Sequence, residues 1–340
     1  MTVDDRLDAL RDVIRHDVGN RGLARDPSDN LLTRTAGDFA AACRSIAEAP
    51  SPFVCIVTGF FIPHGEPPAC ETDGPLGAVF LARVLSALRV PVLLVADRSM
   101  GEAIEAGLDA ARVSAEASGV ATAYIDRPPH DVGWVDSVVF ADGGPCTHLI
   151  ALERVGPSHT TDSLRSQPES TPELVEAWER SVPAAERDRC HSMRGRDITE
   201  FTAPAHLLFE HAARLVPPVT TIGIGDGGNE LGMGKVPWDT IRRNIPNGGL
   251  IACRVPADHL IVAGVSNWGA YALAAGVLLL RGEKGDAALF DPERERDLLR
   301  VMVERGPLVD GVAGRPTATV DGLTWEQYAE PLVAMGRLMR

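Results

Sequence analysis

Residues 221–235 constrain this chain more than any other segment, because they place a glycine-rich acidic loop directly after a short β-branched run. Six glycines alternate there with Asp226, Asn229, Glu230 and Lys235. Glycine loses more conformational freedom on folding than other residues do, so packing alone rarely selects six of them in one segment. The segment therefore predicts a strand whose carboxyl end approaches a ligand closely. An enzyme or a small-molecule binder is favoured over a scaffold protein.

Short apolar runs alternate with helical periodicity along the chain and predict an α/β fold. Strands are expected at 53–57, 90–95, 121–125, 137–140, 148–152 and 250–255, with a further core segment at 260–263. Helices are expected at 3–16, 36–47, 76–88, 203–214 and 268–280, and the tail from 291 onward is expected to be helical. This order is typical of a mostly parallel or mixed central sheet with helices on both faces, a three-layer architecture.

The length and composition favour a single domain over residues 1–340. A chain of 340 residues with 45% hydrophobic content can bury one large core, and no internal repeat or low-complexity linker divides it. Residues 156–200 are polar and rich in proline and serine. They predict an excursion over the surface.

Charge and cysteine usage narrow the partners and the compartment. The formal net charge of -14 makes nucleic acid and anionic membranes poor partners. The longest apolar run, 269–280, is too short to cross a bilayer, and the first residues lack an apolar signal segment. The six cysteines have no metal-finger spacing, so a cytoplasmic protein with reduced, buried thiols is expected. The sequence leaves open whether the chain forms a homo-oligomer.

Acidic, amide and hydroxyl side chains follow several predicted strands. In open α/β sheets, ligands bind at the carboxyl ends of the strands, so these loops are expected to share one cleft. The loops contain Glu71 with Asp73, Asp97, Glu153 with Arg154, Asp226 through Glu230, and Ser266 with Asn267.

Four carboxylates are candidate ligands for a divalent metal, because Mg²⁺ and Mn²⁺ prefer oxygen ligands. They are Glu71, Asp73, Asp226 and Glu230. The alternative for Asp73 is that it caps the helix that follows it. For Glu153, a surface ion pair with Arg154 is the alternative to a functional role.

The glycine loop does not fit the nucleotide-binding fingerprints. Gly223, Gly225 and Gly228 have dinucleotide-type spacing, but Asp239 comes too early and Asp258 too late for the ribose-binding acid. The P-loop pattern also fails, so no nucleotide cofactor is expected. A tight turn whose polar side chains bond their own backbone is the structural alternative.

Several segments together resemble the carboxyl-terminal domain of the D-glutamate cyclases. They are residues 19–22, 58–60, 71–77, 148–154, 193–195, 222–235 and 264–269. The resemblance covers nearly the whole chain and implies an α/β fold. It also implies a hydro-lyase that interconverts D-glutamate with 5-oxo-D-proline and water, and it supports a divalent metal in the acidic cleft. The expected partner is a small acidic amino acid.

That reaction assigns roles to the candidate residues. Deprotonating the amine calls for a general base, for which Glu153 is the first candidate and His64 the second. The other expected catalytic residues are Asp226, Asn229 and Glu230. Arg194 or Lys235 would neutralise the substrate carboxylates, and amides of the glycine loop would hold the oxyanion. The expected substrate-binding residues are Thr58, Gly59, Arg194, Gly227, Gly228, Lys235, Ser266 and Asn267.

Two other functions stay open at this point. Carboxylates around divalent cations also serve phosphatases and phosphoryl-transfer enzymes. A non-catalytic metabolite-binding or metal-binding protein would use the same residues.

Overall fold

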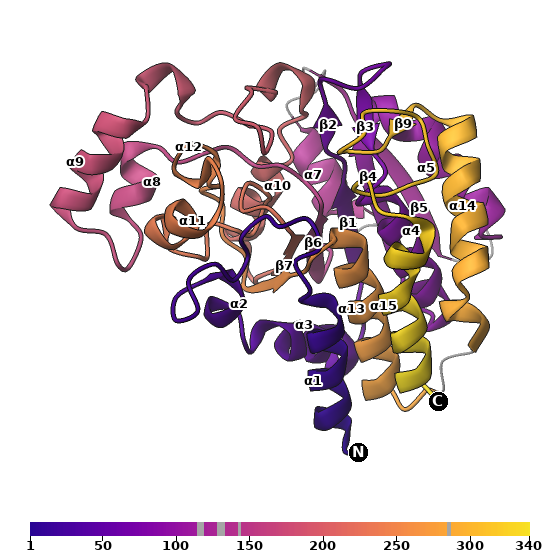
Figure 1. Ribbon diagram of the computed structural model, residues 1–340. Helices are drawn as coiled ribbons and strands as arrows, with labels where there is room; N and C mark the ends of the chain where they lie inside the picture. The colour runs from indigo at the N-terminus through magenta and orange to yellow at the C-terminus, as the bar shows by residue number, and fades with distance from the viewer. Residues whose placement is uncertain (114–118, 128–132, 142–143, 284–286) are drawn as a thin grey trace.

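A six-stranded parallel sheet forms the centre of the protein, in the order β5-β4-β1-β6-β7-β8 (Figure 1). The computed structural model describes residues 1–113, 119–127, 133–141, 144–283 and 287–340. The strands are β1 (Val54–Thr58), β4 (Val92–Asp97), β5 (Val120–Ile125), β6 (His148–Leu152), β7 (Thr220–Gly225) and β8 (His259–Val262). The predicted α/β class is confirmed.

Helices cover both faces of the sheet because successive residues of its strands point to opposite faces and both sets are apolar. In β1, Val54 and Ile56 pack on one face, whereas Cys55 and Val57 pack on the other. The first face is covered by α1 (Val3–Ile14), α3 (Asp38–Glu48), α4 (Pro75–Ala87), α5 (Gly101–Ala110), α13 (Ser266–Leu280), α14 (Pro292–Arg305) and α15 (Trp325–Leu338). The second is covered by α7 (Trp134–Val139), α10 (His206–Ala212), α11 (Trp238–Asn244) and α12 (Gly248–Ile251).

The strand order reverses between β1 and β6. From β1 the chain runs outward through β4 to β5, and from β6 it runs outward in the other direction through β7 to β8. Crossovers leave such a switch point on opposite faces, which opens a crevice at the carboxyl ends of the two strands. A small sheet of β2 (Phe61–Ile62), β3 (Ala69–Glu71) and β9 (Leu308–Val309) follows β1 at this edge.

Three secondary-structure predictions were wrong. The run 137–140 lies mostly in α7, because periodicity cannot separate a short apolar strand from a buried helix. The run 250–255 begins inside α12, which follows a left-handed Asn247. The tail after 291 is not helical throughout, since β9 and a loop at 310–324 separate α14 from α15.

The segment 156–200 leaves the sheet and then returns to it. It forms α8 (Thr161–Arg165) and α9 (Pro172–Ser181) at the left of Figure 1. Trp178 of α9 is buried in the apolar cluster that covers the second face of the sheet, so the excursion packs against that face. The returning chain pairs Cys190 with Pro157 and brings residues 190–198 back to the sheet edge.

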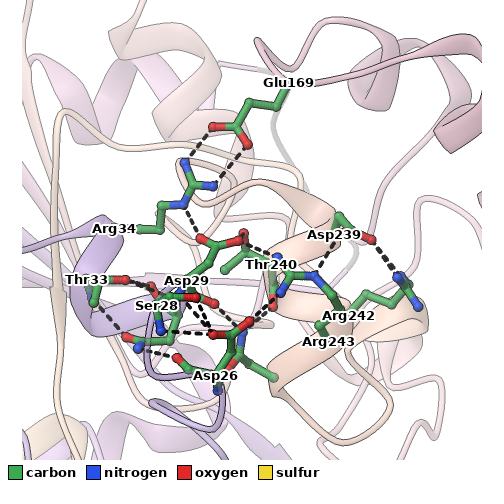
Figure 2. A network of polar contacts seen from close by, with 12 residues as sticks. Asp26, Ser28, Asp29, Thr33, Arg34, Glu169, Asp239, Thr240, Arg242 and Arg243 are labelled. Atoms are coloured by element: carbon green, nitrogen blue, oxygen red, sulfur yellow. Dashed lines mark hydrogen bonds and ion pairs between the residues drawn. The ribbon is translucent and has the colours of Figure 1, made fainter.

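A surface network joins the N-terminal segment to the second face. Figure 2 shows Asp29 between Arg34, at the end of α2 (Leu31–Arg34), and Arg243 of α11. Arg34 also binds both carboxylate oxygens of Glu169 in the excursion, at 2.5 and 3.0 Å. The arginines lower the pKa of Asp29 to about 2, through the hydrogen bond from Arg34 first. The network fixes residues 26–34 against α11.

None of the described helices is long and apolar enough to cross a membrane. The six cysteines are all buried and free, which confirms the predicted buried thiols.

Acid is expected to destabilise the fold through His148, which begins β6. Burial lowers the pKa of His148 to about 4, whereas an unfolded histidine titrates near 6.5. Between these values the unfolded state binds more protons, so the free energy of unfolding falls as pH drops from 6.5 to 4. The full effect is about 3 kcal/mol.

Denaturant titrations of wild type and His148→Asn across this pH range measure the effect. The variant should lose less stability on acidification than wild type does. Parallel pH profiles for the two proteins would contradict the assignment.

Candidate active site

A cavity of about 140 Å³ lies at the switch point. Five carboxylates line it: Glu71, Asp73, Glu153, Asp226 and Asp321. The first four come from three of the loops that were expected to share a cleft, and the structure brings them together. Arg21, His64 and Arg194 add cationic or titratable groups to the lining, with Ser192 and Met193 beside them.

Three of the carboxylates lie close enough to hold one cation. Asp73, Glu153 and Asp226 each offer an oxygen atom, and these atoms lie within 4.8 Å of one another. The Oδ2 atom of Asp226 is buried and accepts no hydrogen bond from a described residue, although the guanidinium of Arg21 lies 3.1 Å from it as an ion pair. Crowded oxygen donors with an unused lone pair fit a hard divalent cation such as Mg²⁺ or Mn²⁺.

Burial raises the pKa of these acids above the ordinary carboxyl range. The pKa of Asp73 rises to about 7, first through burial and then through the nearby charge of Asp321. Burial, followed by repulsion from Asp226, raises the pKa of Glu153 well above its usual value. Burial also raises the pKa of Glu71 and of Asp226, although Arg21 opposes the shift at Asp226. Asp73, with a pKa of about 7, can therefore hold and release a proton near neutral pH.

Asp73 and Asn267 cap each other's helices. The carboxylate of Asp73 accepts from the backbone N–H groups of Ser266 and Asn267, at 2.9 and 2.8 Å, at the start of α13. The side-chain oxygen of Asn267 accepts from the N–H groups of Gly74 and Gly77, at 2.9 and 2.7 Å, at the start of α4. Asp73 was expected either to bind metal or to cap the helix that follows it, α4. Its carboxylate instead caps α13. Asn267, predicted to bind substrate, is fully used in holding the two helices together.

Glu153 is held in a strained and fixed position. Its backbone φ is +43°, which a residue with a side chain rarely adopts and which commonly marks functional sites. The hydroxyl of Ser266 donates to Oε2 of Glu153 at 2.5 Å. Ser266 thus orients Glu153. This hydrogen bond accounts for the buried Ser266 hydroxyl without a direct contact between Ser266 and substrate.

The glycine loop binds its own carboxylate. Glu230 accepts from the backbone N–H groups of Asp226, Gly227 and Gly228, at 2.9, 2.6 and 2.7 Å. The N–H groups of Gly227 and Gly228, which we expected to face the substrate, donate to Glu230 in this structure. Glu230 is also not among the residues that line the cavity, so its place differs from that expected of a metal ligand. Its role is to fix the turn that presents Asp226.

Asn229 connects the glycine loop to the returning excursion. Its amide donates to the carbonyl of His191 at 2.8 Å, and its Oδ1 atom is buried without a partner in the described chain. Asn229 thereby holds the segment that supplies Ser192, Met193 and Arg194 to the cavity. Arg194 is exposed there.

Lys235 lies away from the cavity lining. Its ammonium group donates to Asp38 and to the carbonyl of Asp258, both at 2.6 Å. These contacts secure α3 against β8 and leave the ammonium outside the site. The prediction that Lys235 neutralises a substrate carboxylate has no support in this geometry.

Thr58 and Gly59 lie behind the cavity at the end of β1. The hydroxyl of Thr58 is buried with no hydrogen-bond partner in the described ranges. The carbonyl of Gly59 accepts from Arg154 at 3.1 Å, and Gly59 has φ +124°, which favours glycine.

Two charged residues of the lining, Arg21 and Asp321, were not predicted to belong to the site. The guanidinium of Arg21 lies 3.1 Å from Asp226 and 3.0 Å from Asp321. Arg21 and Asp321 lie in loops that do not follow a strand of the main sheet. The expectation that ligands bind at the carboxyl ends of strands therefore does not predict them. The local signals of those loops are the turn formers at 17–22, which include the resemblance segment 19–22, and the Asp-Gly pair at 321–322.

Arg154 forms a buried ion pair beneath the site. It is fully buried and donates to Asp97 at 2.8 Å and to the carbonyl of Ala203 at 2.7 Å. Asp97, which was expected at the cleft, does not line the cavity and instead binds Arg154. Arg154 is therefore not the ion-pair partner of Glu153. Arg154 instead ties β4, the loop after β1 and residue 203 together.

Replacing Arg154 with Met should therefore destabilise the protein by about 3–5 kcal/mol, since it leaves Asp97 as an unpaired buried charge. Arg98→Met is the matched control, because Arg98 forms its pair with Asp126 at the surface. That control should change little. Equal shifts of the denaturation midpoint in the two variants would contradict the structural role of Arg154.

The fold and the cavity define a class: an α/β protein with an acidic cavity at the switch point of a parallel sheet. The sequence profile of the D-glutamate cyclase-like, C-terminal family matches residues 10–335. The human protein named D-glutamate cyclase, mitochondrial, is 32% identical over 287 residues, which cover 82% of this chain and 40% of that protein. The chain belongs to the D-glutamate cyclase-like, C-terminal family. It spans less than half the length of this curated relative.

Proposed function

We propose that this protein is a hydro-lyase that interconverts D-glutamate with 5-oxo-D-proline and water. Membership of the family and the name of the human relative support this reaction. The observation that carries the proposal is the polarity of the cavity. Its buried side has clustered carboxylates, and its exposed side has Arg194 and His64.

This polarity matches an acidic amino acid. The amino group would lie beside Glu153, and a carboxylate would lie toward Arg194, whose planar guanidinium suits it. Burial and the charge of Arg194 lower the pKa of His64, which is consistent with the two groups lying close together. The volume of about 140 Å³ holds about ten water-sized groups, the scale of a small amino acid.

The reaction requires two proton transfers in addition to bond formation. The nitrogen bonds to the γ-carboxyl carbon, a carbon–oxygen bond breaks, and two ammonium protons leave with that oxygen as water. Glu153 would accept a proton from nitrogen and return one to the departing oxygen. Ser266 would keep Glu153 in the orientation that this needs.

Asp73, Glu153 and Asp226 would hold a divalent cation, which we propose to be Mg²⁺ or Mn²⁺. Such an ion supplies positive charge that offsets the clustered acids and polarises a carboxyl group. Asp73 would keep its two backbone hydrogen bonds to α13 while it does so. Glu71, a predicted ligand, lines the same cavity and would add negative charge to it.

The phosphoryl-transfer alternative is less well supported. Phosphate sites commonly use backbone N–H groups of glycine-rich loops, and Glu230 occupies those of this loop. A metabolite-binding protein without turnover is separated from the cyclase by assay. A cytoplasmic location and homo-oligomerisation remain proposals beside the enzymatic one.

Glu153→Gln is expected to lower kcat by roughly 10²–10⁴-fold, because general acid–base catalysis contributes that much. The assay follows D-glutamate and 5-oxo-D-proline in both directions by chiral chromatography. Glu169→Gln is the control, since it removes an acid that binds Arg34 at the surface. A well-folded Glu153→Gln protein with full turnover would show that Glu153 is not the base, and a wild type without turnover would remove the proposal itself.

Arg194→Gln is expected to raise KM for D-glutamate about tenfold or more and to change kcat less, since Arg194 binds a carboxylate away from the reacting carbon. Arg165→Gln, on exposed α8, is the control. Steady-state kinetics separate the two constants. An unchanged KM would place the carboxylate elsewhere.

A further inference from the structure

Arg21 places a positive charge inside the acidic cavity. Its guanidinium bridges Oδ2 of Asp226 at 3.1 Å and Oδ1 of Asp321 at 3.0 Å, and it donates to the carbonyl of Gly264 at 3.1 Å. Asp226 is also one of the three carboxylates whose oxygen atoms cluster within 4.8 Å. Asp226 therefore pairs with Arg21 and is also one of the three acids that could hold a metal ion.

The turn that carries Arg21 is held in place from two sides. The carboxylate of Asp17 accepts from the backbone N–H groups of residues 21, 22 and 23, at 2.8, 2.7 and 3.0 Å. Beyond the turn, the amide of Asn244 binds the segment that follows, and the network of Figure 2 fixes that segment to α11. Asp17 itself is outside the cavity lining.

Asp321 is presented by a second turn of the same kind. Asp310 is fully buried and accepts from the N–H groups of Val312, Ala313 and Gly322, at 2.9, 2.7 and 2.8 Å. Asp321 adopts φ +55°, and its Oδ2 atom is buried without a hydrogen-bond partner among the described residues. Two Asp-centred turns from opposite ends of the chain thus bring one arginine and one further acid to the site.

We propose that Arg21 is a positioning residue that acts as the resident counter-cation of this cavity and competes with a divalent metal ion for Asp226. The proposal rests on the metal site of the proposed function. Both cations need the same carboxylate, and a guanidinium charge a few ångströms away repels an incoming ion. Because Asp17 holds the Arg21 turn, Asp17 controls the affinity for metal from outside the cavity.

The test is Mn²⁺ binding to the full chain, measured by isothermal titration calorimetry. Arg21→Gln should bind Mn²⁺ at least about tenfold more tightly than wild type, whereas Arg21→Lys keeps the charge and should stay within about threefold. Arg98→Gln removes an equal charge at a surface pair and should leave the Kd unchanged. Circular dichroism and thermal melting report whether each variant folds.

Asp17→Asn gives an independent readout with a distinctive sign. If Asp17 contributed only its negative charge, its loss would weaken Mn²⁺ binding slightly. If Asp17 holds the turn that carries Arg21, its loss should release Arg21 from Asp226 and strengthen Mn²⁺ binding several-fold. This variant decides the question if Arg21→Gln does not fold. Tighter binding in Arg21→Gln or Asp17→Asn supports the proposal.

Equal or weaker Mn²⁺ binding in the folded variants overturns it. If wild type binds Mn²⁺ and the variants do not bind more tightly, only the role of Arg21 falls. If neither wild type nor Arg21→Gln binds Mn²⁺, the metal site and the role of Arg21 fall together. Turnover of D-glutamate is scored separately, so the cyclase proposal is judged by its own assay.

Discussion

Mutual repulsion among buried carboxylates is the constraint to which the rest of the structure responds. Five acids surround one small cavity, and a charged group removed from water is costly unless partners compensate it. The compensating contacts come from two distant parts of the chain. The start of α13 donates to Asp73 through its backbone and to Glu153 through the Ser266 hydroxyl, and Arg21 bridges Asp226 and Asp321. Burial first, and the charges of neighbouring acids after it, still raise the pKa of Asp73, Glu153 and Asp226.

The incomplete compensation gives the site its chemical capacity. Acids that keep protons near neutral pH can pass them to and from a reacting nitrogen or oxygen, and a cation entering the cluster relieves the remaining repulsion. The surrounding framework keeps the geometry fixed while this happens. Asp73 and Asn267 join the starts of α4 and α13, and Glu230 locks the turn that presents Asp226.

The sequence predicted the layers of the fold and four of the five cavity acids, because both follow from local rules. Buried parallel strands are continuous apolar runs, and ligand-binding side chains follow their carboxyl ends. Arg21 and Asp321 were not predictable in this way, since tertiary contacts bring their loops to the edge from outside the main sheet. The two misassigned strands, 137–140 and 250–255, are short apolar runs whose helical packing depends on distant partners.

The sequence could not predict that Glu230 turns toward the N–H groups of its own loop. An acid beside glycines is equally consistent with a metal ligand and with a side chain that binds its own turn, and only the arrangement of the amides separates the two. The same holds for Lys235, whose partners Asp38 and Asp258 are far from it in the chain or on another loop.

We expect the substrate to bind in the acidic cavity at the carboxyl ends of β1 and β6. A crystal structure of the protein with Mn²⁺ and 5-oxo-D-proline would show whether it does. An anomalous manganese peak should lie among Asp73, Glu153 and Asp226, with ligand density that extends from there to Arg194. Ligand bound at another surface while this cavity contains only water would contradict it.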